Sequence, residues 1–190
     1  ADRYLTTMSV THVNLQLSAL MPVVYTGAAL VLVRRYSASR MWSQVRRHKA
    51  SVIQAMAMIV KTLMAQPVAS GERDHSVRAV HYFLPLPKGT KEAFEERYGV
   101  RLLNNYGSSE TLVGVVTDLP DERSKWPSIG LAGPGYDVRI AGENGSALPP
   151  GECGEIQVRG QAGVSLMAGY WRDEQATRAA FTDDGWFRTG

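Results

Sequence analysis

Short apolar runs alternate with helical periodicity from Ala28 to Val116, and no other feature constrains the fold of this chain as strongly. The run Ala29 to Val33 is apolar throughout, which is typical of a strand buried on both faces of a sheet. Further short runs cover residues 51–54, 79–84, 101–104 and 112–116, and segments with helical spacing separate most of them. Strands that alternate with helices are typical of βαβ units. The sequence therefore predicts an α/β fold with a parallel sheet.

The segments between the apolar runs have apolar residues at helical spacing, and residues that can begin or end a helix flank two of these segments. Ser37 can cap a helix whose inward stripe consists of Met41, Trp42 and Val45. A second helix ends before Pro67, and its inward stripe is Met56, Ile59, Val60, Leu63 and Met64. A third helix is expected over residues 91–98, and residues 66–76 are expected to form a polar loop.

The most apolar region, Leu17 to Val33, does not have the pattern of a membrane span. Pro22, Thr26 and Gly27 interrupt it, and a spanning helix requires roughly 20 mostly apolar residues. We expect a buried helix, a turn at Thr26 and Gly27, and then a core strand. The first residues of the chain lack the basic and apolar regions of a signal peptide.

Charge and cysteine content exclude some classes of protein. The chain has 21 basic and 18 acidic residues, which gives a net charge of +3, and its basic residues are spread along the sequence. A nucleic-acid-binding surface would need a dense basic stripe interleaved with aromatic residues. The single Cys153 excludes an internal disulfide and fits a reducing compartment, so we expect a cytoplasmic protein. No histidine lies near Cys153 in the sequence, which argues against a nucleophilic role.

The pattern changes after a charged connector that contains Pro120. The following part is rich in glycine and has short alternating segments. Residues 136–140 and 154–158 are expected to be antiparallel strands, and Asn144-Gly145 between them is a strong hairpin signal. We therefore predict an αβ subdomain over residues 1–120 and a small, mainly antiparallel β subdomain over residues 121–190, with the boundary near residues 118–127.

One loop combines side chains that suit a nucleotide. The segment Asn104 to Thr111 reads Asn-Asn-Tyr-Gly-Ser-Ser-Glu-Thr and follows an expected strand, and parallel α/β sheets bind ligands at the carboxyl ends of their strands. Tyr106 can stack on a base, and Gly107 lets the backbone approach closely. The hydroxyls can donate to phosphate oxygens, and Glu110 suits Mg²⁺ shared with phosphates. Taken alone, the segment also fits a polar turn between two strands.

Further motifs follow in a fixed order along the chain. They are Ser128-Ile129-Gly130, Pro134-Gly135, Gly151 to Ile156, Gly169-Tyr170-Trp171, and Asp184 to Gly190, which reads Asp-Gly-Trp-Phe-Arg-Thr-Gly. Together with the loop at Asn104, this order resembles the acyl-adenylate-forming superfamily of AMP-binding enzymes. That superfamily includes acyl-CoA synthetases, luciferases and the adenylation domains of peptide synthetases.

Within this superfamily the chain looks most like crotonobetaine/carnitine-CoA ligases. The segments that carry the narrower likeness are Leu30 to Val33 with Tyr36-Ser37-Ala38, Ile59 to Pro67, and Trp126 to Gly130. Similarity within the superfamily predicts the acid substrate poorly. A quaternary ammonium acid would favour an aromatic or acidic partner, and the candidates by location are Tyr25, Tyr82 and Phe83.

The resemblance implies roles for particular residues. Tyr106 matches the aromatic residue that packs against adenine, and the backbone at Asn104 and Asn105 would border the base. Ser109 matches the hydroxyl that contacts phosphate, and Glu110 matches the acidic ligand of Mg²⁺. Two more residues are secondary candidates: Thr111 beside them, and His12, which aligns with a histidine near the acyl pocket although the proline and phenylalanine of that family segment are missing here.

The resemblance also implies a reaction. A carboxylic acid, ATP and Mg²⁺ would give an acyl-adenylate, which CoA then captures, and no protein nucleophile is required. The family's phosphate loop, its ribose-binding aspartate and its carboxy-terminal domain with a lysine have no counterpart between Ala1 and Gly190. We therefore expect an internal piece of the large N-terminal domain that turns over negligibly alone.

Two other functions fit the same motifs. A peptide-synthetase-type adenylation domain would load a carrier protein in place of free CoA. A non-catalytic nucleotide-binding module would keep the fold without the reaction. A homo-oligomer is compatible with each of these functions.

Overall fold

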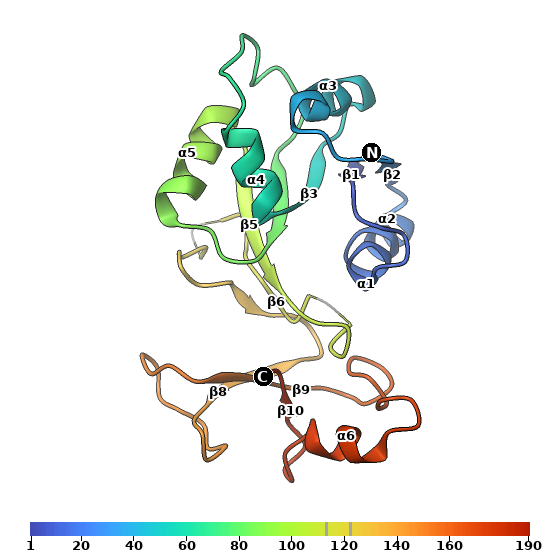
Figure 1. Cartoon of the computed structure of the whole chain (residues 1–190), viewed down its shortest axis with the longest axis vertical. Helices are drawn as coiled ribbons and strands as arrows, with labels where there is room; N and C mark the ends of the chain where they lie inside the picture. Colours follow the sequence, from blue (N-terminus) through green and yellow to red (C-terminus); the bar gives the residue numbers. More distant parts are fainter. Residues whose placement is uncertain (113, 122) are drawn as a thin grey trace. The chain divides into compact units, whose positions relative to one another are not determined.

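The computed structural model describes residues 1–112, 114–121 and 123–190 (Figure 1). Its internal contacts divide the chain into two compact units. Unit one comprises residues 1–106 and 116–131, and unit two comprises residues 107–115 and 132–190. The segment between Tyr106 and Val116 therefore leaves unit one and returns to it. The assignment of separate subdomains to residues 1–120 and 121–190 stays a prediction.

Unit one is built on a parallel sheet, as the alternating pattern predicts. The sheet order is β2-β1-β3-β4-β5-β6-β7. Strands β1 to β5 pair in parallel, and β6 pairs antiparallel to β5. The strand bounds are β1 Arg3–Thr6, β2 Ala29–Leu32, β3 Val52–Met56, β4 Ala79–Phe83, β5 Arg101–Tyr106, β6 Val116–Thr117 and β7 Leu131–Ala132.

Three amphipathic helices pack on this sheet and form the core with it (Figure 1). They are α3 (Ala38–His48), α4 (Ala57–Met64) and α5 (Lys88–Tyr98). The predicted inward residues Met41 and Val45 of α3 are fully buried. Helix α5 begins three residues earlier than predicted: Pro87 is its N-cap, and the Pro87 carbonyl accepts the first helical hydrogen bond, from the Lys91 N–H at 3.0 Å.

The strand at residues 29–32 differs from its prediction. Strand β2 lies at the edge of the described sheet and pairs only with β1, and Leu32 is exposed. An unbroken apolar run predicts burial on both faces, but an edge strand has one neighbour and shields its side chains less. The apolar run identified a strand correctly but not its position.

The segment that was predicted to be a buried helix forms a helix that is longer and more exposed than predicted. It consists of α1 (Val13–Leu15), a π-helical turn η1 (Gln16–Leu20) and α2 (Met21–Thr26), and Gly27 ends it in a left-handed conformation. One stripe is buried, which contains Leu15, Ala19 and Val23, whereas Tyr25 is 92% exposed. Pro22 directly follows the π-helical turn, where the Met21 N–H bonds to the Gln16 carbonyl five residues back, so the α-helical hydrogen-bond pattern is already interrupted at this point.

A buried polar network attaches α1 to the carboxyl end of the sheet. The Thr6 hydroxyl at the end of β1 donates to Oε1 of Gln54 in β3 at 2.6 Å. The Gln54 amide donates to Oδ1 of Asn14 at 2.8 Å. All three residues are buried, and buried polar groups that satisfy one another fix the relative position of the elements that carry them.

Removing the centre of this network should destabilise the protein. We expect Gln54→Leu to lower the free energy of unfolding by about 2–3 kcal/mol, because Thr6 and Asn14 then keep buried polar groups without their partner. Urea denaturation followed by circular dichroism measures the change. The matched control is Gln16→Leu, since the Gln16 side chain is exposed and makes one hydrogen bond at the surface. Equal losses for the two variants would contradict this account of the network.

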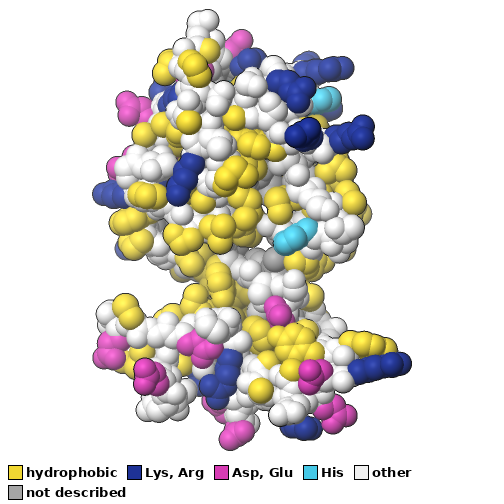
Figure 2. Space-filling model, in the orientation of Figure 1, with side chains coloured by type: hydrophobic (Ala, Val, Ile, Leu, Met, Phe, Trp, Pro, Cys, Tyr) yellow, Lys and Arg dark blue, Asp and Glu magenta, His cyan; other side chains and the backbone are white. Residues whose placement is uncertain are grey.

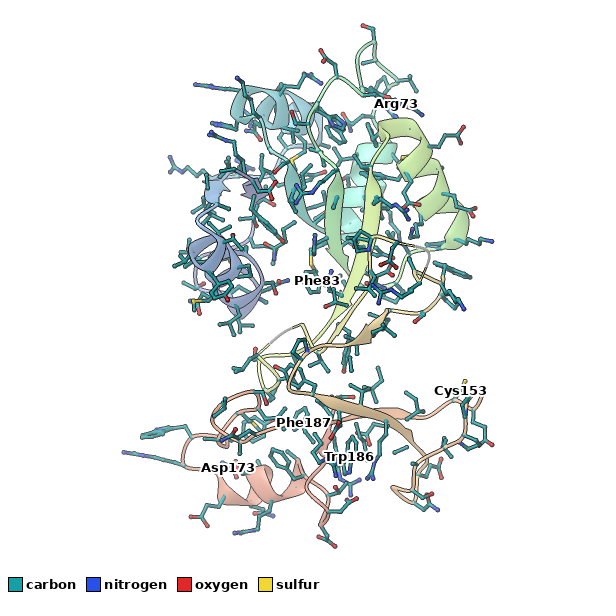
Figure 3. All side chains as sticks on the ribbon, turned by 180° about the vertical axis from the view of Figure 1, so that it is seen from behind. Arg73, Phe83, Cys153, Asp173, Trp186 and Phe187 are labelled. Atoms are coloured by element: carbon teal, nitrogen blue, oxygen red, sulfur yellow. The ribbon has the colours of Figure 1, made fainter. Side chains whose placement is uncertain are left out.

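Unit two contains the predicted antiparallel sheet. Its order is β10-β9-β8, with β8 at Asp137–Ala141, β9 at Glu155–Arg159 and β10 at Phe187–Arg188. Helix α6 (Glu174–Ala179) has Asp173 as its N-cap, whose carboxylate accepts a hydrogen bond from the Ala176 N–H at 2.8 Å (Figure 3). The fold class is the predicted one, a mixed and mostly parallel sheet with helices plus a small antiparallel sheet.

Two local predictions are corrected by the structure. The Asn144-Gly145 turn does not join β8 directly to β9; it closes a small hairpin in which Ala141 bridges Ala147, and a further turn follows at residues 150–151. The strand predicted for residues 112–116 is also wrong in its extent. Leu112 has a φ of 56°, which ends extended structure, and β6 begins only at Val116. Val113 lies outside the described residues.

In Figure 2, several Lys and Arg side chains gather at the upper right of the view, and others are spread over the rest of this face. In the described part of the chain, no helix has the length and apolar character to cross a membrane.

Candidate active site

Strand β5 extends further than predicted and contains three of the predicted site residues. Asn104, Asn105 and Tyr106 are its last residues, so the loop itself begins at Gly107. Asn105 is buried, and its side-chain amide donates to the carbonyl of Leu103 at 3.0 Å. Asn104 accepts a hydrogen bond from the Asp118 N–H at 2.9 Å. These bonds fix the end of the strand from which the loop starts.

The loop closes on the hydroxyl of Thr111. This side chain is fully buried, and its oxygen accepts a hydrogen bond from the Ser108 N–H at 2.8 Å. Ser109, by contrast, is exposed. The two hydroxyl residues therefore differ in their surroundings, since Thr111 stabilises the loop while the Ser109 side chain lies at its surface.

Glu110 is held at both its backbone and its side chain. Its carbonyl accepts a hydrogen bond from the Met167 N–H at 2.7 Å. Its Oε1 accepts a hydrogen bond from the Tyr170 hydroxyl at 3.1 Å. The Ser108 hydroxyl has the largest effect on the Glu110 carboxyl and lowers its pKa; partial burial opposes this, and Tyr170 adds to the lowering. Glu110 is therefore a half-buried carboxylate that stays ionised at neutral pH.

A second tyrosine holds the same loop. The hydroxyl of Tyr136 lies 2.7 Å from the carbonyl oxygen of Thr111 and 3.0 Å from that of Ser165. All these residues belong to unit two. Sequence reasoning missed Tyr136 and Met167, because their role depends on contacts between segments that are distant in the chain. The only sequence signal for Tyr136 is its place directly after the Gly133-Pro134-Gly135 turn.

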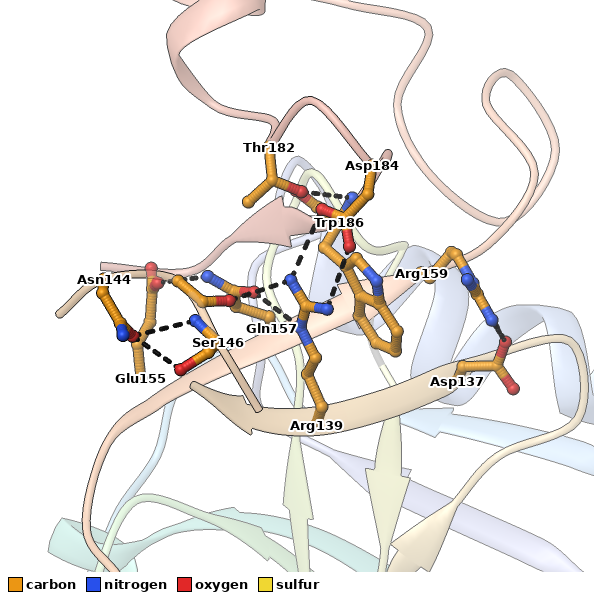
Figure 4. A network of polar contacts seen from close by, with 11 residues as sticks. Asp137, Arg139, Asn144, Ser146, Glu155, Gln157, Arg159, Thr182, Asp184 and Trp186 are labelled. Carbon is orange, nitrogen blue, oxygen red and sulfur yellow. Dashed lines mark hydrogen bonds and ion pairs between the residues drawn. The ribbon is translucent and has the colours of Figure 1, made fainter. Parts of the chain in front are cut away.

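The terminal motif Asp184 to Gly190 is fixed to β8 and β9 by several contacts, and Figure 4 shows Asp184 and Trp186 beside Arg139. The guanidinium groups of Arg139 and Arg159 lie 4.3 Å and 4.7 Å, respectively, from the centroid of the Trp186 ring. The Thr189 hydroxyl donates to the Ile156 carbonyl at 2.7 Å. The Gly190 N–H donates to Glu155 Oε1 at 3.0 Å. The Thr-Gly pair is therefore attached to the second sheet.

The predicted residues for the acid substrate belong to unit one. His12 is exposed, and its Nδ1 accepts a hydrogen bond from the Asn14 N–H at 3.0 Å, so it caps α1. Tyr82 is buried in the core, where desolvation, followed by the charges of Asp118 and Glu95, raises its pKa to about 12. Phe83, labelled in Figure 3, is half-buried at the carboxyl end of β4. Burial argues against Tyr82 as a partner of a substrate cation.

The comparison with protein families shows to which family this chain belongs. The family model described as "AMP-binding enzyme" matches residues 1–171. The chain belongs to the AMP-binding enzyme family. This agrees with the likeness that the ordered motifs predict, and it covers the whole of unit one and the loop that carries Glu110.

Curated relatives of this AMP-binding family member include CoA ligases. The crotonobetaine/carnitine–CoA ligase of Salmonella paratyphi C (strain RKS4594) is 41% identical over 189 residues. The enzyme of that name from Shigella sonnei (strain Ss046) is 42% identical over the same length. In both comparisons all of this chain is covered but only 37% of the relative, so the chain spans just over a third of the length of these relatives.

Solved structures of related enzymes have the same fold. O-succinylbenzoate coenzyme A synthetase from Bacillus subtilis, in complex with AMP, matches with a TM-score of 0.82 and 31% identity. The same enzyme with ATP and a magnesium ion matches with a TM-score of 0.82 and 29% identity. Both comparisons cover all of this chain and 38% of the solved chain. Nucleotide and Mg²⁺ binding are thus seen in structures that share this fold.

The donor set of this family member fits a shared metal site. Among the described residues, no group of three or more His, Cys, Asp or Glu could hold a metal ion alone. Mg²⁺ in nucleotide enzymes is usually held by one or two carboxylates together with substrate phosphates. The ionised Glu110, next to the exposed Ser109 hydroxyl, is chemically suited to that arrangement.

Proposed function

We propose that this chain carries the adenylate-binding loop of an ATP-dependent, AMP-forming acid–CoA ligase. The observation that carries the proposal is the fixed Glu110 carboxylate, which Tyr170 and Met167 hold in the loop that follows Tyr106. A rigid, ionised carboxylate beside an exposed hydroxyl suits the binding of a nucleotide phosphate and its cation. The family match and the CoA ligases among the relatives support this function.

Each residue of the loop has a proposed role. The ring of Tyr106 would lie against adenine, and the backbone of Asn104 and Asn105 would border the base. Ser109 would donate its hydroxyl to a phosphate oxygen. Two further residues serve the loop: Gly107, which lets the backbone approach the nucleotide, and Thr111, whose buried hydroxyl keeps the loop closed beside the phosphates.

The proposed reaction has two steps, and both balance without a protein nucleophile. A carboxylate oxygen of the acid attacks the α-phosphorus of ATP, the bond to the β-phosphate oxygen breaks, and pyrophosphate leaves. The thiolate of CoA then attacks the acyl carbon, and AMP leaves with the oxygen that came from the acid. Bound Mg²⁺ would neutralise phosphate charge, so that two anions can approach each other. The contribution of the chain is orientation and charge placement.

We propose carnitine-like acids as the first substrates to test, because two curated relatives have crotonobetaine and carnitine in their names. In unit one, the exposed Tyr25 and the half-buried Phe83 are the aromatic candidates for a quaternary ammonium group, and His12 is a candidate near the acyl chain. These assignments rest on the relatives and on sequence position.

A substrate panel tests the proposal. The protein at its full natural length is incubated with ATP, Mg²⁺ and CoA, together with carnitine, crotonobetaine or simple fatty acids. We expect acid-dependent formation of AMP, pyrophosphate and one acyl-CoA in equal amounts, measured by liquid chromatography and mass spectrometry. Replacement of CoA by a carrier-protein thiol separates a ligase from a peptide-synthetase-type domain. ADP as the nucleotide product, or no acid-dependent product with any member of the panel, would contradict the proposal.

A further inference from the structure

Segment 167–170 contacts Glu110 from two directions. The Met167 N–H donates to the Glu110 carbonyl at 2.7 Å, and the Tyr170 hydroxyl donates to Glu110 Oε1 at 3.1 Å. The first contact fixes the backbone of the loop, and the second, together with the Ser108 hydroxyl, restrains the rotation of the carboxylate. A carboxylate has two oxygens, so a phenol can hold one while the other faces a cation.

The position of Tyr170 is itself fixed by the first turn of α6. The Tyr170 N–H donates to the Thr177 hydroxyl at 2.8 Å, and that hydroxyl donates to the Asp173 carbonyl at 2.7 Å. The Asp173 N–H in turn donates to the Tyr170 carbonyl at 3.2 Å. These bonds make a compact turn between Tyr170 and the helix, and the capping carboxylate of Asp173 starts that helix.

Gly169 shows how closely this turn packs. Its φ is +151°, and a Cβ built there would lie 3.0 Å from Cγ2 and 3.1 Å from Oγ1 of Thr177. A larger residue at this positive φ would be strained and would crowd the Thr177 side chain that binds the Tyr170 N–H. Glycine at position 169 therefore allows the backbone of Tyr170 to pack against α6. From this position the phenol hydroxyl of Tyr170 reaches Glu110.

We propose that Tyr170 is a positioning residue for Glu110 and that Thr177 sets the position of Tyr170. This inference rests on the proposed function of Glu110 as the carboxylate that meets the nucleotide-bound cation. Tyr170 touches neither the nucleotide nor the cation in this role; it acts by keeping the carboxylate in one orientation. Loss of the phenol hydroxyl leaves the charge in place but removes one of the two hydroxyl contacts that restrain the rotation of the carboxylate.

The side chain of Tyr170 is 39% exposed, so removal of its hydroxyl leaves the core of unit two intact. We expect Tyr170→Phe to weaken binding of the Mn²⁺·ATP complex about 3–10-fold, since a hydrogen bond to a charged group at a partly exposed site has a moderate effect. Binding of AMP without metal should not change. Electron paramagnetic resonance of Mn²⁺ and isothermal titration with AMP measure the two quantities in the protein at its full natural length.

Three further variants separate the possible outcomes. Thr177→Val should weaken Mn²⁺·ATP binding in the same direction, and Thr177→Ser, which keeps the hydroxyl, should retain it. The neighbouring and exposed Trp171→Phe is the control and should bind as the wild type does. If Glu110→Gln weakens Mn²⁺·ATP binding but Tyr170→Phe does not, the positioning role is wrong while the proposed function stands. If Glu110→Gln also leaves it unchanged, the proposed function of Glu110 fails first.

Discussion

Replacing Glu110 with glutamine should lower kcat/KM for acid-dependent pyrophosphate release about 10²–10³-fold in the protein at its full natural length, the usual effect of losing one charge-stabilising group from a reaction centre. Glutamine keeps the size of the side chain and can still accept a hydrogen bond from Tyr170, but it lacks the negative charge that a hard cation requires. Initial rates at several Mg²⁺ concentrations measure the effect.

The control for this variant is Glu143→Gln, an exposed glutamate of the same unit. We expect wild-type rates for Glu143→Gln and wild-type thermal unfolding for both variants, because Glu110 is only half-buried and its neighbours keep their hydrogen bonds. If the Glu110→Gln enzyme keeps more than half of the wild-type rate at every Mg²⁺ concentration, Glu110 has no role in the reaction.

The second large effect is on stability and concerns the Ser128-Ile129-Gly130 motif. We expect Gly130→Ala to lower the free energy of unfolding by at least about 3 kcal/mol, because a Cβ here meets backbone and has nowhere to move. The Cβ would lie 2.0 Å from the carbonyl oxygen of Thr117 and 2.4 Å from the nitrogen of Asp118, and φ is +123°. The motif therefore needs glycine because residues 117–118 pass directly over it.

The matched control is Gly145→Ala. Gly145 also has a positive φ, +78°, but nothing lies within 4 Å of the position of its Cβ. This variant has backbone strain without a clash, and we expect a loss of about 1 kcal/mol. Urea denaturation of both variants gives the comparison. If the two lose the same stability, the close approach at Gly130 does not explain the motif.

Most of the fold could be predicted from the sequence because its elements are strongly periodic. The alternation of apolar runs with helical stripes predicted a parallel sheet, and the buried Met41 and Val45 confirm the inward face of α3. Position within the sheet was harder to predict. Strand β2 is as apolar as a central strand, yet it is an edge strand in the described sheet, since the order of strands depends on long-range pairing.

The errors in the loops have physical causes that act at a distance. The Asn144-Gly145 signal identified a turn correctly, but a second turn follows before β9, because the strand partner is chosen by the register of the sheet and not by the nearest turn. Leu112 has a left-handed φ that an apolar residue rarely adopts, so the apolar segment after Thr111 suggested extended structure.

The site could be predicted only in part. The residues that would meet a ligand lie together in one segment, from Asn104 to Thr111, and a local pattern is enough to find them. The residues that hold this segment are spread over the next sixty positions of the chain. Met167 acts through its backbone N–H, which no side chain reveals, and Tyr136 and Tyr170 act through contacts that exist only after folding.

One isotope measurement tests the central claim most directly, namely that the acid is activated as an acyl-adenylate. The protein at its full natural length is given ATP, Mg²⁺, CoA and the best acid of the panel, with that acid labelled with oxygen-18 in its carboxylate. The account predicts that the label appears in the phosphate of AMP, since a carboxylate oxygen attacks the α-phosphorus and leaves with AMP. Oxygen-18 in inorganic phosphate together with ADP, or unlabelled AMP beside the acyl-CoA product, would contradict it.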